Sequence, residues 1–343
     1  MQTLFFCNTN YQLLVAVQIA LSFQKNGSII ITNEIKNYED IVIKLRKTKL
    51  FERVAYIDVK TAKNPIILTI QCILGMVPQE IKDCVFDEFV GFNLDIPSHI
   101  VYAFFYEKNK NIVVNKMEEG LMSLNTPETS CGVLEGSYKI RRLLNKRNLK
   151  DVISGFYCFS PKANKSGIPS IQIPLIDYNS RIKEYLNAIF CRNIKSEYNE
   201  KYIFLSCIYD VEGGEPIGEL GLAIKIAERV GKDNLLVKVH PRDDKGKYIR
   251  AGLKVDENSV VPFEVIQINN DFSDKILITT LSGSILNFNQ VLENTPISYY
   301  GYRLCKLEGN PLASHYKDVL EQYLADKELG LRNIHVLKHL EEL

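Results

Sequence analysis

The sequence predicts an α/β protein with two domains, each built on a parallel sheet. Short apolar, strand-like runs alternate with helical patterns along most of the chain, which is typical of parallel sheets covered by helices. The 343 residues exceed what one ordinary core holds and suit two domains. A strand, a polar turn and a helix open the chain, and the same pattern returns at residue 202. We therefore expect two Rossmann-like domains, at residues 1–170 and 171–343.

The first domain is expected to begin with a strand at residues 3–7 and a helix at 12–24. Asn8 and Asn10 lie in the turn between them, with Thr9 or Asn10 as the helix cap. At the carboxyl edge of the strand these amides either meet a ligand or only cap the helix, and the sequence leaves both readings open. The turn has no Gly-x-Gly-x-x-Gly, so it does not indicate a dinucleotide site.

Further strands of this domain are expected at residues 28–32 and 54–59, and a helix at 38–49. The apolar runs at 85–90 and 100–105 fit either strands or buried helix segments.

An acidic turn follows the strand-like run at residues 112–114. It consists of Glu118, Glu119 and Gly120. Two adjacent carboxylates repel each other, and partial burial raises the pKa of one of them, which suits a general base near neutral pH. Gly120 can adopt positive φ and lets a substrate approach the backbone. The alternative is a solvated acidic turn.

Residues 160–170 are rich in turn-forming residues and mark the expected linker, with a helix at 176–195 after it. Before the linker, the basic stretch 138–150 faces an acidic substrate, membrane headgroups or merely solvent. In the second domain, strands are expected at 202–208, 235–239, 275–279 and 297–300, and helices from residue 315 to 343.

The strand at residues 235–239 runs directly into His240 and Pro241. Proline biases the preceding residue towards an extended backbone, so the imidazole is expected at the carboxyl end of a strand, where α/β sheets bind ligands. The alternative is a loop histidine followed by a proline that stops the strand.

Hydroxyl groups follow the strand at 275–279. The run Thr280-Leu-Ser282-Gly283-Ser284 leads into a helical pattern at 285–292, with Ser282 as the expected cap. A helix start with free N–H groups and hydroxyls is a phosphate-binding arrangement. Glu264 lies upstream, after a short turn in an apolar segment.

The whole-chain composition excludes several function classes. Lys plus Arg number 42 and Asp plus Glu 41, a net charge of +1, so no nucleic-acid partner is expected. No apolar run approaches the ~20 residues of a membrane span, and the first residues do not resemble a secretory signal, so a cytoplasmic location is expected. The eight cysteines form no Cys-x-x-Cys, and His335 and His339 lie in an apolar, helix-like stretch, so no metal site is expected.

Three short elements follow one another along the chain: Glu118-Glu119-Gly120, His240-Pro241 and Ser282-Gly283-Ser284. Their order resembles the acidic-acidic-Gly, His-Pro and Ser-rich motifs of bacterial sialyltransferases. The opening run at residues 6–14 looks most like glycosyltransferase family 52, which includes lipooligosaccharide sialyltransferases. The resemblance implies a GT-B fold, two Rossmann-like domains facing across a cleft. It also implies inverting, metal-independent transfer from CMP-sialic acid to a glycan hydroxyl of a bacterial surface polysaccharide or lipooligosaccharide, with no cofactor.

The resemblance also implies roles for individual residues. Glu118 would be the base, with Glu119 beside it and the choice between them open, and His240 would be the acid or electrostatic partner at the leaving phosphate. Pro241 would shape the cytidine pocket and Glu264 would bind the ribose hydroxyls. Ser282 and Ser284 would bind the phosphate. Gly283 separates these two serines, whereas related enzymes often have adjacent hydroxyl residues. The residue that makes the main contact is therefore left open among Thr280, Ser282 and Ser284.

The sequence leaves two alternative functions open. One keeps the fold and changes the donor, for example to a UDP-hexose. The other is a non-catalytic nucleotide-binding protein with a GT-B-like fold. Under the main hypothesis the base lies in the first domain, on the acceptor side, and the second domain binds the CMP-sugar donor. Membrane contact would be peripheral, at the inner face of the cell membrane, and a homodimer fits the family 52 resemblance.

Overall fold

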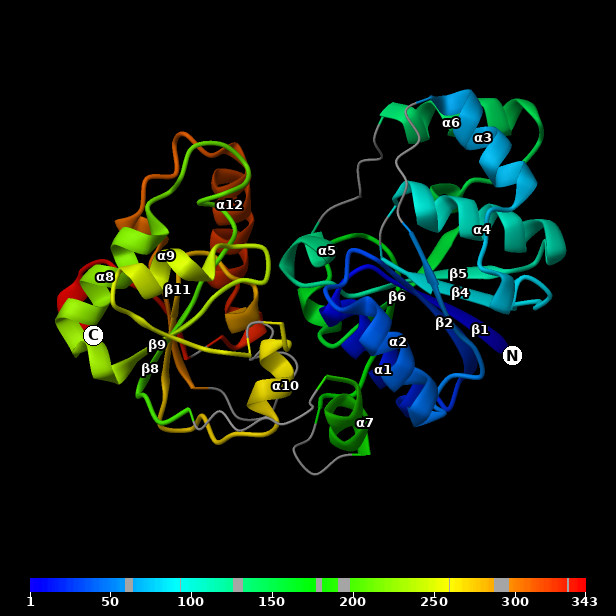
Figure 1. The fold of residues 1–343 in the computed structure, drawn as a ribbon. Coiled ribbons are helices and arrows are strands. Elements are labelled where there is room, and N and C mark those ends of the chain that lie inside the picture. The colour runs from blue at the N-terminus through cyan, green and yellow to red at the C-terminus, as the bar shows by residue number, and fades with distance from the viewer. Residues whose placement is uncertain are drawn as a thin grey trace. The chain divides into compact units, whose positions relative to one another are not determined.

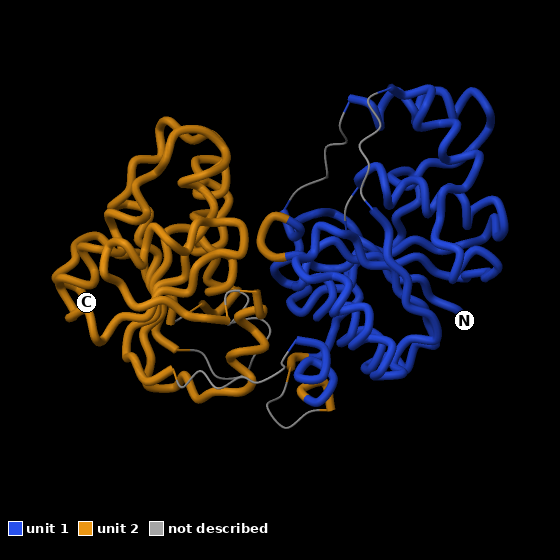
Figure 2. Tube along the Cα trace, in the orientation of Figure 1, with its two compact units in different colours: residues 1–119, 123–174, 184–190 blue, residues 120–122, 175–183, 191–343 orange. Residues whose placement is uncertain are grey.

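The computed structural model describes residues 1–58, 64–92, 94–125, 132–176, 181–190, 198–258, 260–286, 296–331 and 333–343. Contacts divide the chain into two compact units (Figure 2). Unit 1 comprises residues 1–119, 123–174 and 184–190, and unit 2 comprises residues 120–122, 175–183 and 191–343.

Unit 1 is built on a seven-stranded parallel sheet in the order β3-β2-β1-β4-β5-β6-β7 (Figure 1). β1 pairs with β2 on one side and with β4 on the other, so the strand order reverses between β1 and β4. Open α/β sheets bind ligands at such a reversal, outside the carboxyl ends of the strands. The strands are β1 Gln2–Cys7, β2 Asn26–Thr32, β3 Val54–Ile57, β4 Glu88–Gly91, β5 Val113–Met117, β6 Ile153–Cys158 and β7 Ser170–Gln172.

Local capping signals explain where the helices of unit 1 begin. Thr9 caps α1 by accepting the Gln12 N–H at 3.1 Å. Asp95 caps α4, which also has Pro97 in its first turn, so the apolar run at 100–105 is helical. The run at 85–90 includes the first three residues of β4. The helices are α1 Asn10–Ser22, α2 Tyr38–Thr48, α3 Pro65–Leu74, α4 Ile96–Lys108, α6 Gly132–Leu143 and the 3₁₀ turns Gln79–Ile81, Leu149–Asp151 and Pro161–Ala163; α5 Leu121–Asn125 and α7 Arg181–Phe190 include residues of both units.

Two apolar clusters of described residues lie on opposite sides of α4 in unit 1. One face of α4 packs on the sheet, where Val101, Tyr102 and Phe105 join apolar side chains of β1 and β4. The opposite face of α4 packs against α3 and α6, through residues including Ile100 and Ala103. Helices α3 and α6 therefore form an outer layer that is separated from the sheet by α4 (Figure 1).

Unit 2 is built on a six-stranded parallel sheet in the order β10-β9-β8-β11-β12-β13, which reverses between β8 and β11 (Figure 1). Its strands are β8 Tyr202–Leu205, β9 Leu235–Lys238, β10 Lys254–Val255, β11 Ile276–Thr279, β12 Ile297–Tyr300 and β13 Ile334–Val336. Its helices are α8 Glu219–Val230, α9 Lys245–Arg250, α10 Phe263–Gln267, α12 Pro311–Ala325 and the 3₁₀ turns Lys232–Asn234, Tyr302–Leu304, Lys327–Leu329 and Leu340–Glu342.

The prediction of helices from residue 315 to 343 is wrong beyond α12. The helix ends at Ala325, and Asp326 caps a short 3₁₀ turn instead. The chain then forms β13, which pairs with β12 at the edge of the sheet. His335 lies on that strand and His339 precedes the last 3₁₀ turn, so the two histidines do not share a helix face.

Two other predicted helices extend past the described part of the chain. Residues 284–286 are helical, and 287–292 of the predicted helix lie outside the described residues. Of the helix expected at 176–195, the structure describes α7. No helix within the described ranges is long and apolar enough to cross a membrane.

Candidate active site

Glu118 follows β5 directly and its side chain is completely buried. Its N–H donates to the Tyr157 carbonyl at 2.9 Å, which extends the pairing of β5 with β6 by one residue. Its Oε2 accepts the Phe159 N–H at 2.9 Å, and its Oε1 accepts the Tyr11 hydroxyl at 3.2 Å. The carboxyl group is thus held between the end of β6 and the first turn of α1.

Burial raises the pKa of Glu118 to about 7, although the hydrogen bonds from Phe159 and Tyr11 lower it. Removal of a carboxylate from water penalises its charged form, and here that penalty outweighs two donated hydrogen bonds. The sequence suggested partial burial beside a second carboxylate as the cause of a raised pKa, and burial is the largest cause in the structure. A carboxyl group with this pKa exchanges a proton near neutral pH.

The next two residues of the turn are more open. Glu119 is half-buried, and its N–H donates to the Ser123 hydroxyl at 2.9 Å. Gly120 has φ +76°, and a Cβ placed there would meet no atom within 4 Å. The space around Gly120 therefore leaves room for a bound group to approach the backbone.

The asparagine turn after β1 lies at the strand-order reversal of unit 1. The buried Asn8 side chain donates through Nδ2 to Asp95, the cap of α4, and the Asn8 N–H donates to Gln12 Oε1 at 2.7 Å. Asn8 Oδ1 and Gln12 Nε2 are buried with no hydrogen-bond partner among the described residues. Buried polar atoms are nearly always satisfied, so this pair is a candidate ligand contact. Asn10 is half-buried in the first turn of α1.

His240 lies two residues after β9, as the His-Pro pair predicts. Its N–H donates to the Ser206 hydroxyl at 2.7 Å, which joins it to the end of β8. Its Nδ1 accepts the Arg242 N–H at 3.2 Å. In a neutral imidazole with Nδ1 as the acceptor, the proton is on Nε2. Pro241, the next residue, is half-buried.

The three hydroxyl residues after β11 lie in different environments. The Thr280 hydroxyl is completely buried and donates to Glu219 Oε1 at 2.5 Å. Ser282 and Ser284 are half-buried, and the Ser282 hydroxyl accepts the Ser284 N–H at 3.3 Å. The Thr280 hydroxyl is therefore engaged inside unit 2, and Ser282 and Ser284 remain candidates for phosphate binding. A Cβ on Gly283 would lie 2.9 Å from the Tyr316 hydroxyl oxygen, so a larger residue there would crowd that side chain.

Comparison with known proteins places the chain in a family. A family model described as alpha-2,8-polysialyltransferase (POLYST) matches residues 3–301. The chain belongs to the alpha-2,8-polysialyltransferase family. This confirms the prediction of a sialyltransferase family, and the enzyme class is glycosyltransferase. The finer resemblance to family 52 stays a prediction. No curated protein sequence matches the chain.

Several solved structures are similar to this polysialyltransferase-family chain. A putative UDP-N-acetylglucosamine 2-epimerase from Listeria monocytogenes matches with a TM-score of 0.51 and 10% identity, over 96% of this chain and 89% of that one. Another UDP-N-acetylglucosamine 2-epimerase matches at 0.46 and 15%, over 96% and 88%. MurG from Acinetobacter baumannii matches at 0.48 and 9%, over 100% and 88%. The predicted fold class, GT-B with two Rossmann-like domains, is confirmed.

Glu219 of the polysialyltransferase-family chain was not predicted from the sequence as a site residue. This completely buried residue begins α8, and its carboxylate accepts the Cys207 N–H at 2.9 and 3.0 Å as well as the Thr280 hydroxyl. Glu219 thereby joins the ends of β8 and β11, where the strand order of unit 2 reverses. Burial raises its pKa to about 7. The only sequence signal was an acidic residue in the first helical turn after a glycine-rich loop.

Lys238 was also not predicted, although it is the last residue of β9, two residues before His240. It is buried, donates to the Asn258 carbonyl at 3.0 Å and lies 3.5 Å from Asp256 Oδ2. Burial lowers its pKa, whereas Asp256 and the buried Glu264 of α10 act in the opposite direction. Glu264 thus belongs to a buried charge cluster with Lys238 and Asp256. A lysine inside an apolar strand was the available signal.

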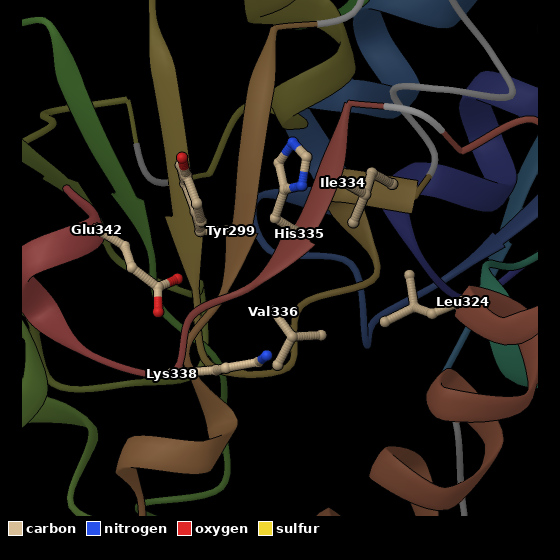
Figure 3. A pocket seen from close by; sticks show the side chains of 7 residues that line it. All are labelled: Tyr299, Leu324, Ile334, His335, Val336, Lys338 and Glu342. Carbon is tan, nitrogen blue, oxygen red and sulfur yellow. The ribbon is translucent and has the colours of Figure 1, made fainter.

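A pocket of about 730 Å³ lies elsewhere in unit 2, against the edge strand β13 (Figure 3). At its wall, the ring centroids of Tyr299 and His335, on adjacent strands, are 5.5 Å apart. None of the residues predicted from the motifs lines it. The lining residues are Tyr299, Leu324, Ile334, His335, Val336, Lys338 and Glu342.

Proposed function

We propose that the protein transfers sialic acid from CMP-sialic acid to a glycan hydroxyl, with inversion and without a metal ion. The acceptor is a bacterial surface polysaccharide or lipooligosaccharide, and the family description suggests an α-2,8 linkage to an acceptor sialic acid. The observation that carries the proposal is the buried Glu118 carboxyl group, whose pKa of about 7 suits a general base.

Tyr11 provides a route for the proton. Glu118 is completely buried, whereas Tyr11 is half-buried and its hydroxyl donates to Glu118 Oε1. In the proposed step, the acceptor oxygen attacks the anomeric carbon as the bond to the CMP phosphate breaks. The acceptor proton passes to the Tyr11 oxygen while the Tyr11 proton passes to Glu118. General-base assistance of this kind contributes roughly 10²–10⁴-fold.

The donor side of the proposal uses the motifs of unit 2. The leaving phosphate gains negative charge, and the His240 Nε2–H with the Ser282 and Ser284 hydroxyls would stabilise it. Donors held in place before the reaction are effective because they need no reorganisation during it. Pro241 would shape the cytidine pocket, and Glu264 would bind the ribose hydroxyls.

A donor screen that measures nucleotide release tests the proposal. We expect release of CMP from CMP-sialic acid in the presence of a glycan acceptor, and none from UDP-hexoses. If the protein turns over UDP-glucose but not CMP-sialic acid, the assignment of CMP-sialic acid as the donor is wrong. Stabilisation by CMP without any turnover would instead support the non-catalytic alternative.

A further inference from the structure

Helix α3 exposes an unusual amount of apolar surface. Five large aliphatic side chains on its outer side are exposed by about half or more, and they define the α3 face: Ile66 60%, Ile67 52%, Ile70 48%, Ile73 62% and Leu74 69%. Single exposed aliphatic residues are ordinary, but a contiguous set marks a binding surface. Residues 64–78 contain no charged side chain.

The orientation of α3 is fixed by its packing on neighbouring helices. The other side of α3 is buried, with Leu68 and Cys72 packed against α4 and α6. The Thr69 and Ser137 hydroxyls are 2.9 Å apart, and a Cβ on Gly136 would lie 2.5 Å from Pro65. The helix is therefore fixed in one rotation, with its aliphatic side directed outwards.

Helix α6 adds positive charge beside this face. Residues 132–150, which include α6, contain six basic residues and one acidic residue, Glu135. Among them, Lys139 and Arg147 are exposed. Arg142, Lys146 and Lys150 form ion pairs with Asp151, Glu107 and Glu135. Leu143 and Leu144, at the end of α6, are exposed by 84% and 51%. An apolar helix face beside an excess of cations is the pattern of helices that lie in a membrane interface.

We propose that the α3 face inserts into the interface of a membrane that carries anionic lipids, with the cations of residues 139–147 against the headgroups. A lipid surface fits better than a second copy of this chain, because a second copy would bring another basic segment to the same interface. The inference does not depend on the catalytic proposal, since vesicle binding is measured without turnover.

The test is co-sedimentation of the full chain with vesicles of phosphatidylcholine alone and of phosphatidylcholine mixed with phosphatidylglycerol. We expect binding to the mixed vesicles that weakens with added salt. The triple variant Ile66→Ser, Ile70→Ser, Ile73→Ser should bind about tenfold or more weakly. Lys139→Glu with Arg147→Glu should weaken binding to the mixed vesicles more than to the neutral ones.

The matched control replaces three exposed aliphatic residues of unit 2, Val211, Ile249 and Leu312, with serine. It should bind like the wild type, and circular dichroism should show that both triple variants are folded. Absence of binding to mixed vesicles, or wild-type binding by the α3 variant, would overturn the proposal. So would a wild-type dimer that the α3 variant converts to a monomer with vesicle binding unchanged, because the face would then belong to a second copy.

Discussion

The Tyr11 hydroxyl lies 3.2 Å from Oε1 of Glu118, so the first turn of α1 contacts the carboxyl group of the residue that follows β5. These residues are 107 positions apart in the chain. The contact lowers the pKa of Glu118 against the larger effect of burial. It also gives a completely buried carboxyl group a connection to a half-buried hydroxyl.

Tyr11→Phe tests this connection through the pH dependence of turnover. Wild-type kcat/KM should rise with pH through about 7, because the base must be deprotonated. The variant loses a hydrogen bond that lowers the pKa of Glu118, so its rise should move to higher pH, and the plateau should fall because the proton route is broken. An unchanged pH profile would show that Tyr11 is only a packing residue.

Glu219→Gln should change stability in a pH-dependent way. The pKa is 4.5 for an ordinary glutamate and about 7 in the folded protein, so the folded state binds the proton more tightly. Stability from this group is fully present below pH 4.5 and is lost as pH rises through about 7. The variant should therefore be more stable than the wild type at about pH 8, by on the order of 3 kcal/mol at most, and not at about pH 5.

Thermal unfolding at the two pH values measures this difference. Glu228→Gln, at an exposed position on the same helix, is the matched control and should behave like the wild type at both. A Glu219→Gln variant that is less stable at both pH values would show that the hydrogen bonds to Cys207 and Thr280 outweigh the cost of the buried charge.

His240→Ala should lower turnover by roughly 10²–10⁴-fold, since it removes the donor proposed to act at the leaving phosphate. His240→Gln keeps a side-chain N–H donor and should retain more activity than His240→Ala. Steady-state kinetics with CMP-sialic acid separates the two variants. Equal and nearly normal rates in both would remove His240 from the reaction.

Replacement of Ser282 and Ser284 by alanine should weaken binding of CMP more than binding of cytidine, because only CMP carries the phosphate. Thr280→Ala is a useful comparison, since the Thr280 hydroxyl is bonded to Glu219 and should affect stability more than CMP affinity. Titration calorimetry with both ligands measures the effect. The same loss for CMP and cytidine would contradict phosphate binding by the serines.

Features encoded by neighbouring residues were predictable from the sequence. Thr9 caps α1, and Pro241 follows a strand that ends two residues before His240, because caps and X-Pro pairs act locally. The alternation of strands and helices was sufficient to predict two parallel sheets.

Features that depend on distant contacts were not predictable. The buried Glu219 carboxylate accepts a hydrogen bond from Thr280, which is 61 residues away in the chain. His335 lies on a strand because β13 pairs with β12, so the local apolar pattern around it was misinterpreted as a helix. Likewise, the outward direction of the α3 isoleucines follows from packing on α4 and α6.

A comparison of the turnover of two variants, Glu118→Gln and Glu119→Gln, tests the central claim most directly. The substitution at 118 keeps the size of the side chain and removes the proton acceptor, so CMP release from CMP-sialic acid should fall by roughly 10²–10⁴-fold with little change in CMP affinity. Glu119→Gln should retain most of the activity. Full activity in Glu118→Gln, with loss in Glu119→Gln, would contradict the assignment of the buried carboxyl group as the base.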